Sequence, residues 1–93
     1  MNVKLRLLFP FRHEVGEDPL NLDLAEGADV EAAVAALAAR FPHLRGKLYD
    51  RRGRPQRYLS ALVNGVPVQS LQGFATRLSP GDELTFLPPV GGG

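Results

Sequence analysis

Residues 29–41 read DVEAAVAALAARF and form the one long helical pattern in the chain. Asp29 is a residue type favoured at a helix N-cap, and the alanines that follow have the highest helix propensity of any residue. Apolar residues recur here at spacings of four, three and four, on one stripe of a helix: Val30, Val34, Leu37 and Phe41. Because Pro42 disfavours helical geometry at the preceding residue, the helix is predicted to end near Arg40.

Strand patterns lie on both sides of this helix. Residues 3–9 and 20–24 alternate apolar and polar side chains, which predicts two half-buried strands joined by a loose loop. Residues 59–63, 66–68 and 84–87 predict three more strands after the helix. Asn64-Gly65 indicates a type I′ hairpin, since both residues tolerate positive φ. Ser79-Pro80-Gly81-Asp82 fits a type II turn.

The segment between the helix and the third strand is the least regular. Leu44 and Leu48 are four residues apart and predict one more amphipathic turn, and Asp50 to Gln56 is predicted to be an exposed loop. The whole order predicts an α+β fold, with a mixed sheet of about five strands and one main helix packed on one face. The first and last strands are expected to be central and parallel. This arrangement resembles the ubiquitin-like β-grasp roll, formed here as a single domain over residues 1–93.

Composition excludes several classes of protein. The 93 residues contain no cysteine, so disulfides, thiolate metal sites and a catalytic thiol are absent. The net charge of +1 does not suit a polybasic nucleic-acid binder, and His13 and His43 alone give little support for a zinc site or a catalytic triad. Lys4 and Arg6 interrupt the first apolar run, so the N-terminus does not fit a secretion signal. No apolar run is long enough to span a membrane. The expected location is the cytoplasm.

The last six residues suggest a chemical role. They are predicted to form a flexible tail of Pro88, Pro89, Val90, Gly91, Gly92 and Gly93. The prolines stiffen the exit from the last strand, and the glycines give a narrow segment that fits a channel in another protein. The terminal carboxylate is ionised at neutral pH and is a poor acyl donor, so it must first be activated, for example as an adenylate. The activated carboxyl group can then accept sulfur or join an amine. The alternative interpretation is that the tail is an ordinary frayed chain end.

Residues 79–93, SPGDELTFLPPVGGG, together with Val63-Asn64-Gly65, resemble the MoaD/ThiS family of ubiquitin-like sulfur carriers. The pattern is a Gly-Asp turn, a strand, Pro-Pro-Val, one variable residue and Gly-Gly. Gly92 and Gly93 correspond to the family's terminal glycines, and Gly91 occupies the variable position. The likeness is greatest to the small subunit of molybdopterin synthase.

This resemblance implies a cycle in which the chain is a carrier and not an enzyme by itself. An adenylating enzyme uses ATP to activate Gly93, and a sulfur donor converts the adenylate to a thiocarboxylate. The tail then enters the large subunit of molybdopterin synthase, in an expected heterotetramer, and gives sulfur to a pyranopterin precursor of the molybdenum cofactor. The resemblance implies no permanently bound cofactor and no metal.

Other recipients stay open. The length of residues 43–57 and the sequence Gly73-Phe74-Ala75-Thr76 are similar to carriers for cysteine biosynthesis, although those usually have Pro-Ala-Val-Ala before Gly-Gly. Pro89 favours the molybdopterin pathway. Related carriers serve thiamine synthesis and tRNA thiolation, and others are conjugated to lysines.

Two surfaces are candidates for partner binding. Leu8, Leu62 and Leu87 are expected on the sheet face opposite the helix, as an apolar docking patch for the partner enzymes, unless the loop 71–78 covers them. A basic cluster comprises Arg45, Lys47, Arg51, Arg52, Arg54 and Arg57. It is interpreted first as a solvated loop and next as a site for an acidic partner. Nucleic acid is the least supported partner, because Tyr49 and Tyr58 are the only nearby aromatic residues.

Overall fold

The structure is a computed structural model, and it describes residues 1–7, 19–56 and 59–87. The strands are β1 (Asn2–Leu7), β2 (Leu20–Asp23), β3 (Ser60–Val63), β4 (Val66–Pro67) and β5 (Glu83–Leu87). The helices are α2 (Val30–Arg40) and α3 (Arg45–Leu48), with 3₁₀ turns η1 (Pro42–Leu44), η2 (Val68–Ser70) and η3 (Gly73–Ala75).

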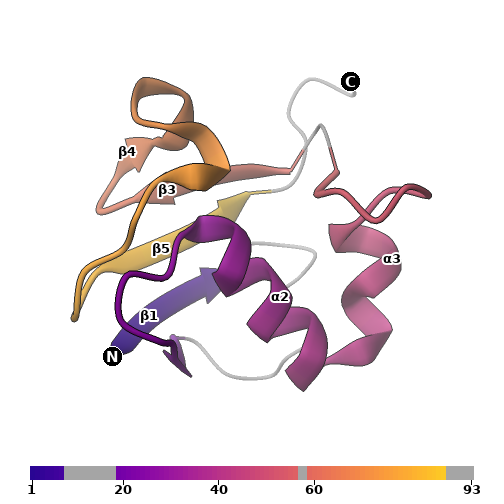
Figure 1. Cartoon of the computed structure of the whole chain (residues 1–93), viewed down its shortest axis with the longest axis horizontal. Coiled ribbons are helices and arrows are strands. Elements are labelled where there is room, and N and C mark those ends of the chain that lie inside the picture. Colours follow the sequence, from indigo (N-terminus) through magenta and orange to yellow (C-terminus); the bar gives the residue numbers. More distant parts are fainter. Residues whose placement is uncertain (8–18, 57–58, 88–93) are drawn as a thin grey trace.

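The strands form a mixed five-stranded sheet in the order β2-β1-β5-β3-β4 (Figure 1). The central strand β5 runs parallel to β1, with Phe86 opposite Leu7, and antiparallel to β3, with Leu87 opposite Ser60. The first and last strands are therefore central and parallel, which confirms the predicted architecture.

One face of the sheet carries the core. Val3, Leu5 and Leu7 of β1 are buried, whereas the residues between them are exposed. The same alternation in β5 buries Leu84 and Phe86 completely. The buried residues of α2 pack against this face, and α3 lies beside α2. The period of two in the strands and the apolar stripe of the helix thus meet in one hydrophobic layer.

Helix α2 begins and ends where its sequence predicts. The Asp29 carboxylate accepts a hydrogen bond of 2.8 Å from the Ala32 amide, which makes Asp29 the N-cap. The last helical residue is Arg40, two residues before Pro42, and the Phe41 amide still bonds to the Leu37 carbonyl. The predicted extra turn is α3, and Leu44 and Leu48 on either end of it are both buried.

The loop 71–78 lies on the helix side of the sheet. The Val30 amide donates to the Thr76 carbonyl at 3.0 Å, and the Leu78 amide donates to the Ala28 carbonyl at 2.9 Å. Leu78 is buried in the core and Phe74 packs against it. The interpretation that this loop covers the leucines of the opposite face is therefore wrong, because its backbone is bound to the start of α2.

Within the ranges described above, no helix combines the length and the apolarity that crossing a bilayer requires.

Candidate functional site

The predicted reactive tail continues directly from the central strand. Its residues, Pro88 to Gly93, lie outside the described part of the chain, so their roles stay a prediction. Strand β5 ends at Leu87, which lies opposite Ser60 of β3, and the preceding residue Phe86 lies opposite Leu7 of β1. Six residues extend at most about 20 Å from that point, because a fully extended chain gains 3.3–3.6 Å per residue. A partner that binds Gly93 therefore holds it within about 20 Å of this end of the sheet.

The start of β5 is fixed by a network around Asn64. Asn64 and Gly65 both have positive φ, at 50° and 82°, as the predicted type I′ turn requires. The Asn64 side-chain nitrogen Nδ2 donates to the Asp82 carboxylate at 3.0 Å, and the Asn64 side-chain oxygen accepts from the Glu83 backbone amide at 2.9 Å. The Asp82 carboxylate also accepts from the Ser79 amide at 2.8 Å, which closes the Pro80-Gly81 turn. Sequence reasoning found both turns but missed the side chains that join them.

The sheet face away from α2 brings together two of the three predicted docking leucines. Leu62 of β3 lies opposite Thr85 of β5 in the register. Leu87 is two residues after Thr85 in β5, so Leu62 and Leu87 are diagonal neighbours on this face. Both are half-buried. Leu8 lies outside the described residues. The pair sits beside the end of β5 from which the tail continues.

The opposite end of the same face is charged. Arg6 and Glu83 form an ion pair with a 3.2 Å separation between Nε and Oε1, and their side chains are 47% and 44% exposed. Lys4 lies opposite Glu83 in the register and is exposed. The open face therefore changes from charged at the start of β5 to apolar at its end, where a partner would be met.

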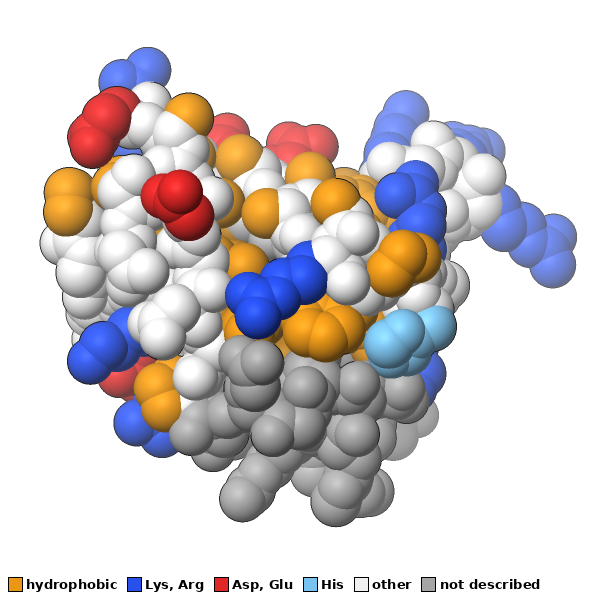
Figure 2. Space-filling view, turned by 90° about the horizontal axis from the view of Figure 1, so that it is seen from below, with side chains coloured by type: hydrophobic (Ala, Val, Ile, Leu, Met, Phe, Trp, Pro, Cys, Tyr) orange, Lys and Arg blue, Asp and Glu red, His pale blue; other side chains and the backbone are white. Residues whose placement is uncertain are grey.

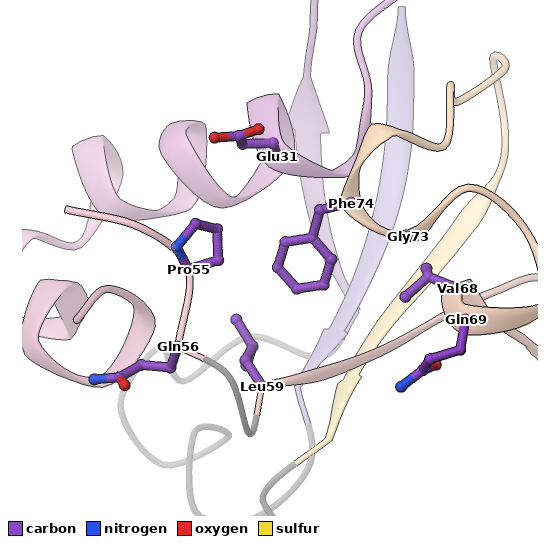
Figure 3. A pocket seen from close by; sticks show the side chains of 8 residues that line it. All are labelled: Glu31, Pro55, Gln56, Leu59, Val68, Gln69, Gly73 and Phe74. Carbon is purple, nitrogen blue, oxygen red and sulfur yellow. The ribbon is translucent and has the colours of Figure 1, made fainter. Parts of the chain in front are cut away.

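A groove of about 350 Å³ lies on the helix side of the sheet. Its lining comes from α2, the segment that leads from α3 to β3, and the 3₁₀ turns η2 and η3: Glu31, Pro55, Gln56, Leu59, Val68, Gln69, Gly73 and Phe74. Figure 3 shows the Phe74 ring pointing between Pro55 and Leu59. The sequence contains no signal for this groove, because its lining comes from four separate segments.

The described residues contain little reactive chemistry. No group of three or more His, Cys, Asp or Glu side chains among them is arranged to hold a metal ion. Burial raises the pKa of the Tyr49 phenol above its usual value, the Arg45 guanidinium opposes this shift, and the Glu31 carboxylate adds to it. The phenol is therefore neutral at physiological pH and is a poor nucleophile.

Residues 7–93 match the ThiS family. The chain is 33% identical to small archaeal modifier protein 3 of Haloferax volcanii over 93 residues, which cover 100% of both chains. It is 32% identical to the sulfur carrier protein CysO of Mycobacterium tuberculosis over 71 residues, or 74% of this chain and 76% of that one.

Solved structures agree with this grouping. Small archaeal modifier protein 1 of Methanosarcina acetivorans has a TM-score of 0.87 at 28% identity, covering 99% of this chain and 96% of that one. The Amycolatopsis orientalis BexX/CysO complex has a TM-score of 0.74 at 25% identity, covering 98% of this chain and 99% of that one. A Pyrococcus furiosus protein described as subunit 1 of a molybdopterin converting factor has a TM-score of 0.74 at 26% identity, covering 97% of this chain and 99% of that one.

These similarities support the modifiers and CysO-type carriers, which sequence analysis left as alternatives, better than the molybdopterin synthase subunit that Pro89 favoured. Members of such a family are small carrier or modifier proteins and not catalytic enzymes. Their fold is the one found here, with α2 packed on a mixed sheet whose first and last strands are central. The chain therefore belongs to the ThiS family of ubiquitin-like sulfur carriers and has the β-grasp fold.

Proposed function

We propose that this chain is a sulfur carrier whose C-terminal carboxylate, on Gly93, is adenylated and then converted to a thiocarboxylate. The family match over residues 7–93 is the observation that carries the proposal, because it includes the Pro-Pro-Val-Gly-Gly-Gly segment. The position of β5 at the centre of the sheet supports it, since a tail attached there has a rigid base.

The chemistry needs no side chain of this protein. The Gly93 carboxylate attacks the α-phosphorus of ATP, and pyrophosphate leaves as the acyl-adenylate forms. Hydrosulfide, or a donor that supplies it, then attacks the acyl carbon, AMP leaves, and a thiocarboxylate remains. The activating enzyme supplies the ATP site and the sulfur donor supplies the nucleophile, which is consistent with a sequence that contains no cysteine.

For the sulfur recipient, we propose a small-molecule acceptor of the kind used in cysteine biosynthesis. The similarity to CysO over 74% of the chain supports this recipient. A second function, attachment of Gly93 to lysines of other proteins, is supported by the full-length similarity to small archaeal modifier protein 3. The large subunit of molybdopterin synthase is a third candidate, supported by a structural neighbour that is 26% identical. All three begin with the same activation step.

The proposed function is tested by intact-mass analysis of the purified chain after incubation with its activating enzyme, ATP and sulfide. The expected product has one oxygen of the terminal carboxylate replaced by sulfur, and it does not form when ATP is omitted. Lysine adducts without a thiocarboxylate would favour the modifier function. An unchanged mass in the presence of an enzyme that activates a related carrier would contradict both.

Replacing Leu62 with Asp is expected to raise the KM of the activating enzyme for the carrier about tenfold, because a charge on a half-buried apolar contact opposes desolvation. The kcat should change little, since the tail is intact. Asn21→Asp is the matched control, because Asn21 is exposed on the edge strand β2. Initial rates of pyrophosphate exchange measure both variants. Equal KM values for the two would exclude Leu62 from the docking surface.

A further inference from the structure

The charges of this chain are unevenly distributed. Six of its eleven basic residues and one of its ten acidic residues lie in residues 45–57, so this segment carries +5 and the rest of the chain carries −4. The described cations of the segment are Arg45, Lys47, Arg51, Arg52 and Arg54, and we call this set the basic loop. Basic side chains gather and project on one side of the molecule in Figure 2. A small chain with a net charge of only +1 thus has a strong local positive field.

The single acidic residue of the segment does not neutralise these arginines. The Asp50 carboxylate accepts from the backbone amides of Arg52 and Arg54, at 2.9 and 3.0 Å. The Asp50 amide donates to the Arg54 carbonyl at 2.7 Å, and the Gly53 amide donates to the Asp50 carbonyl at 3.1 Å. Gly53 adopts a φ of 78°, which suits glycine in a tight turn. The Asp50 carboxylate therefore shapes the turn through the backbone amides.

The base of the basic loop is also held. The Gln56 amide donates to the Leu48 carbonyl at 2.9 Å, and its side chain donates to the Tyr49 carbonyl at 2.9 Å. The Arg45 guanidinium lies 5.5 Å from the centre of the Tyr49 ring. In the described part of the chain, no carboxylate forms an ion pair with Arg51, Arg52 or Arg54, and all three are exposed. A hydrogen-bonded turn thus presents three exposed guanidinium groups that no described carboxylate neutralises, and binding need not order the backbone of that turn.

The basic loop leads to the end of the sheet where β5 stops. Leu59 and Ser60 follow it, and Ser60 lies opposite Leu87 in the register. The tail and the base of the loop therefore leave from the same end of neighbouring strands (Figure 1). A protein that contacts the tail at Leu87 therefore also lies beside the strand to which the basic loop leads.

We propose that the basic loop docks on a carboxylate-rich surface of the activating enzyme, beside the channel that receives the tail. This inference rests on the proposed function and names the chemistry of its partner. Guanidinium groups pair with carboxylates through two parallel hydrogen bonds, so an acidic protein surface matches three arginines on one turn. RNA is a poorer match, because Tyr49 is half-buried with the Arg45 guanidinium over its ring, and bases stack on exposed aromatic side chains.

The test compares pyrophosphate-exchange kinetics of the wild-type chain with those of the triple variant Arg51→Glu, Arg52→Glu, Arg54→Glu. Reversing three exposed charges is expected to raise KM about tenfold or more at low salt, with kcat within about twofold. Between about 0.05 M and about 0.5 M salt, the wild-type KM should rise and approach that of the variant, because screening removes the attraction. The turn should persist, since it uses only backbone atoms of these arginines and the Asp50 carboxylate.

A single-charge pair provides the matched control. Arg52→Glu is expected to raise KM, whereas Arg77→Glu introduces the same charge at the opposite end of the sheet and should leave KM within about twofold. Arg77 is exposed and precedes the turn that begins β5.

Three outcomes would overturn the inference. Equal KM values for the wild type and the triple variant at low salt would show that the basic loop does not contact the enzyme. If the triple variant is activated as well as the wild type but no longer binds bulk tRNA in a gel-shift assay, the partner of the basic loop is RNA and not an acidic protein. A wild-type chain that is not activated at all would instead contradict the proposed function, and the inference with it.

Discussion

Removal of Gly93 is expected to abolish thiocarboxylate formation while leaving the fold unchanged. The deletion moves the terminal carboxylate back by one residue, about 3.3–3.6 Å along an extended tail. A displacement of this size takes the nucleophilic oxygen out of reach of the ATP α-phosphorus, and misplacement by only about 1 Å can cost about 100-fold in rate. The thiocarboxylate should therefore be absent from the intact-mass spectrum after the incubation that converts the full-length chain.

Gly91→Ala is the matched control for this deletion. It alters one glycine of the same segment, keeps the length of the tail, and changes the position that varies in the family pattern. The thiocarboxylate should still form in this variant. Unfolding midpoints of both variants should equal that of the wild type, because the core of the described residues ends at Phe86. Full conversion of the chain that lacks Gly93 would show that another group carries the sulfur.

Phe86→Ala is expected to lower the free energy of unfolding by ~3–5 kcal/mol, because the substitution removes a large side chain from a closed site. Phe86 is 0% exposed and faces α2 from the central strand. Domains of this size are stabilised by only about 5–15 kcal/mol in total, so the variant will be partly unfolded under mild conditions. Equilibrium unfolding in urea, monitored by circular dichroism, measures the change.

Thr85→Ala is the control on the adjacent residue. Thr85 lies in the same strand but on the other face, where it is half-buried between Arg6 and Leu62 in the register. Its replacement should cost less than about 1 kcal/mol, the full range of strand propensity. A similar loss for the two variants would mean that β5 does not bury Phe86 against α2.

Local sequence patterns predicted much of the fold because each acts over a few residues. Asp29 caps α2 through its own carboxylate, and Asn64-Gly65 adopts the positive φ values that its turn demands. Alternation in β1 and β5 separates buried from exposed residues without any tertiary information. The parallel pairing of β1 with β5 required analogy as well, because strand order depends on contacts far apart in the sequence.

Features that depend on tertiary contacts were not predictable. The loop 71–78 has apolar residues that fit either face of the sheet, and its place was settled by backbone bonds to Ala28 and Val30. The Asp50 carboxylate binds the backbone amides of Arg52 and Arg54, and the charge pattern of this segment does not indicate that role. Pro89 favoured a molybdopterin synthase subunit, whereas the similarities to small archaeal modifier protein 3 and to CysO support the alternatives better.

The placement of β5 between β1 and β3 has a mechanical consequence. A pull on Gly93 by a processive protease, or by a protein to which it is joined, is transmitted along the axis of β5. Since the ladder hydrogen bonds to both neighbours are roughly transverse to that axis, the load is shared among them in shear and they must rupture together. A force applied to Gly93 therefore reaches β5 first, and the hydrogen bonds on both sides of β5 resist mechanical unfolding there.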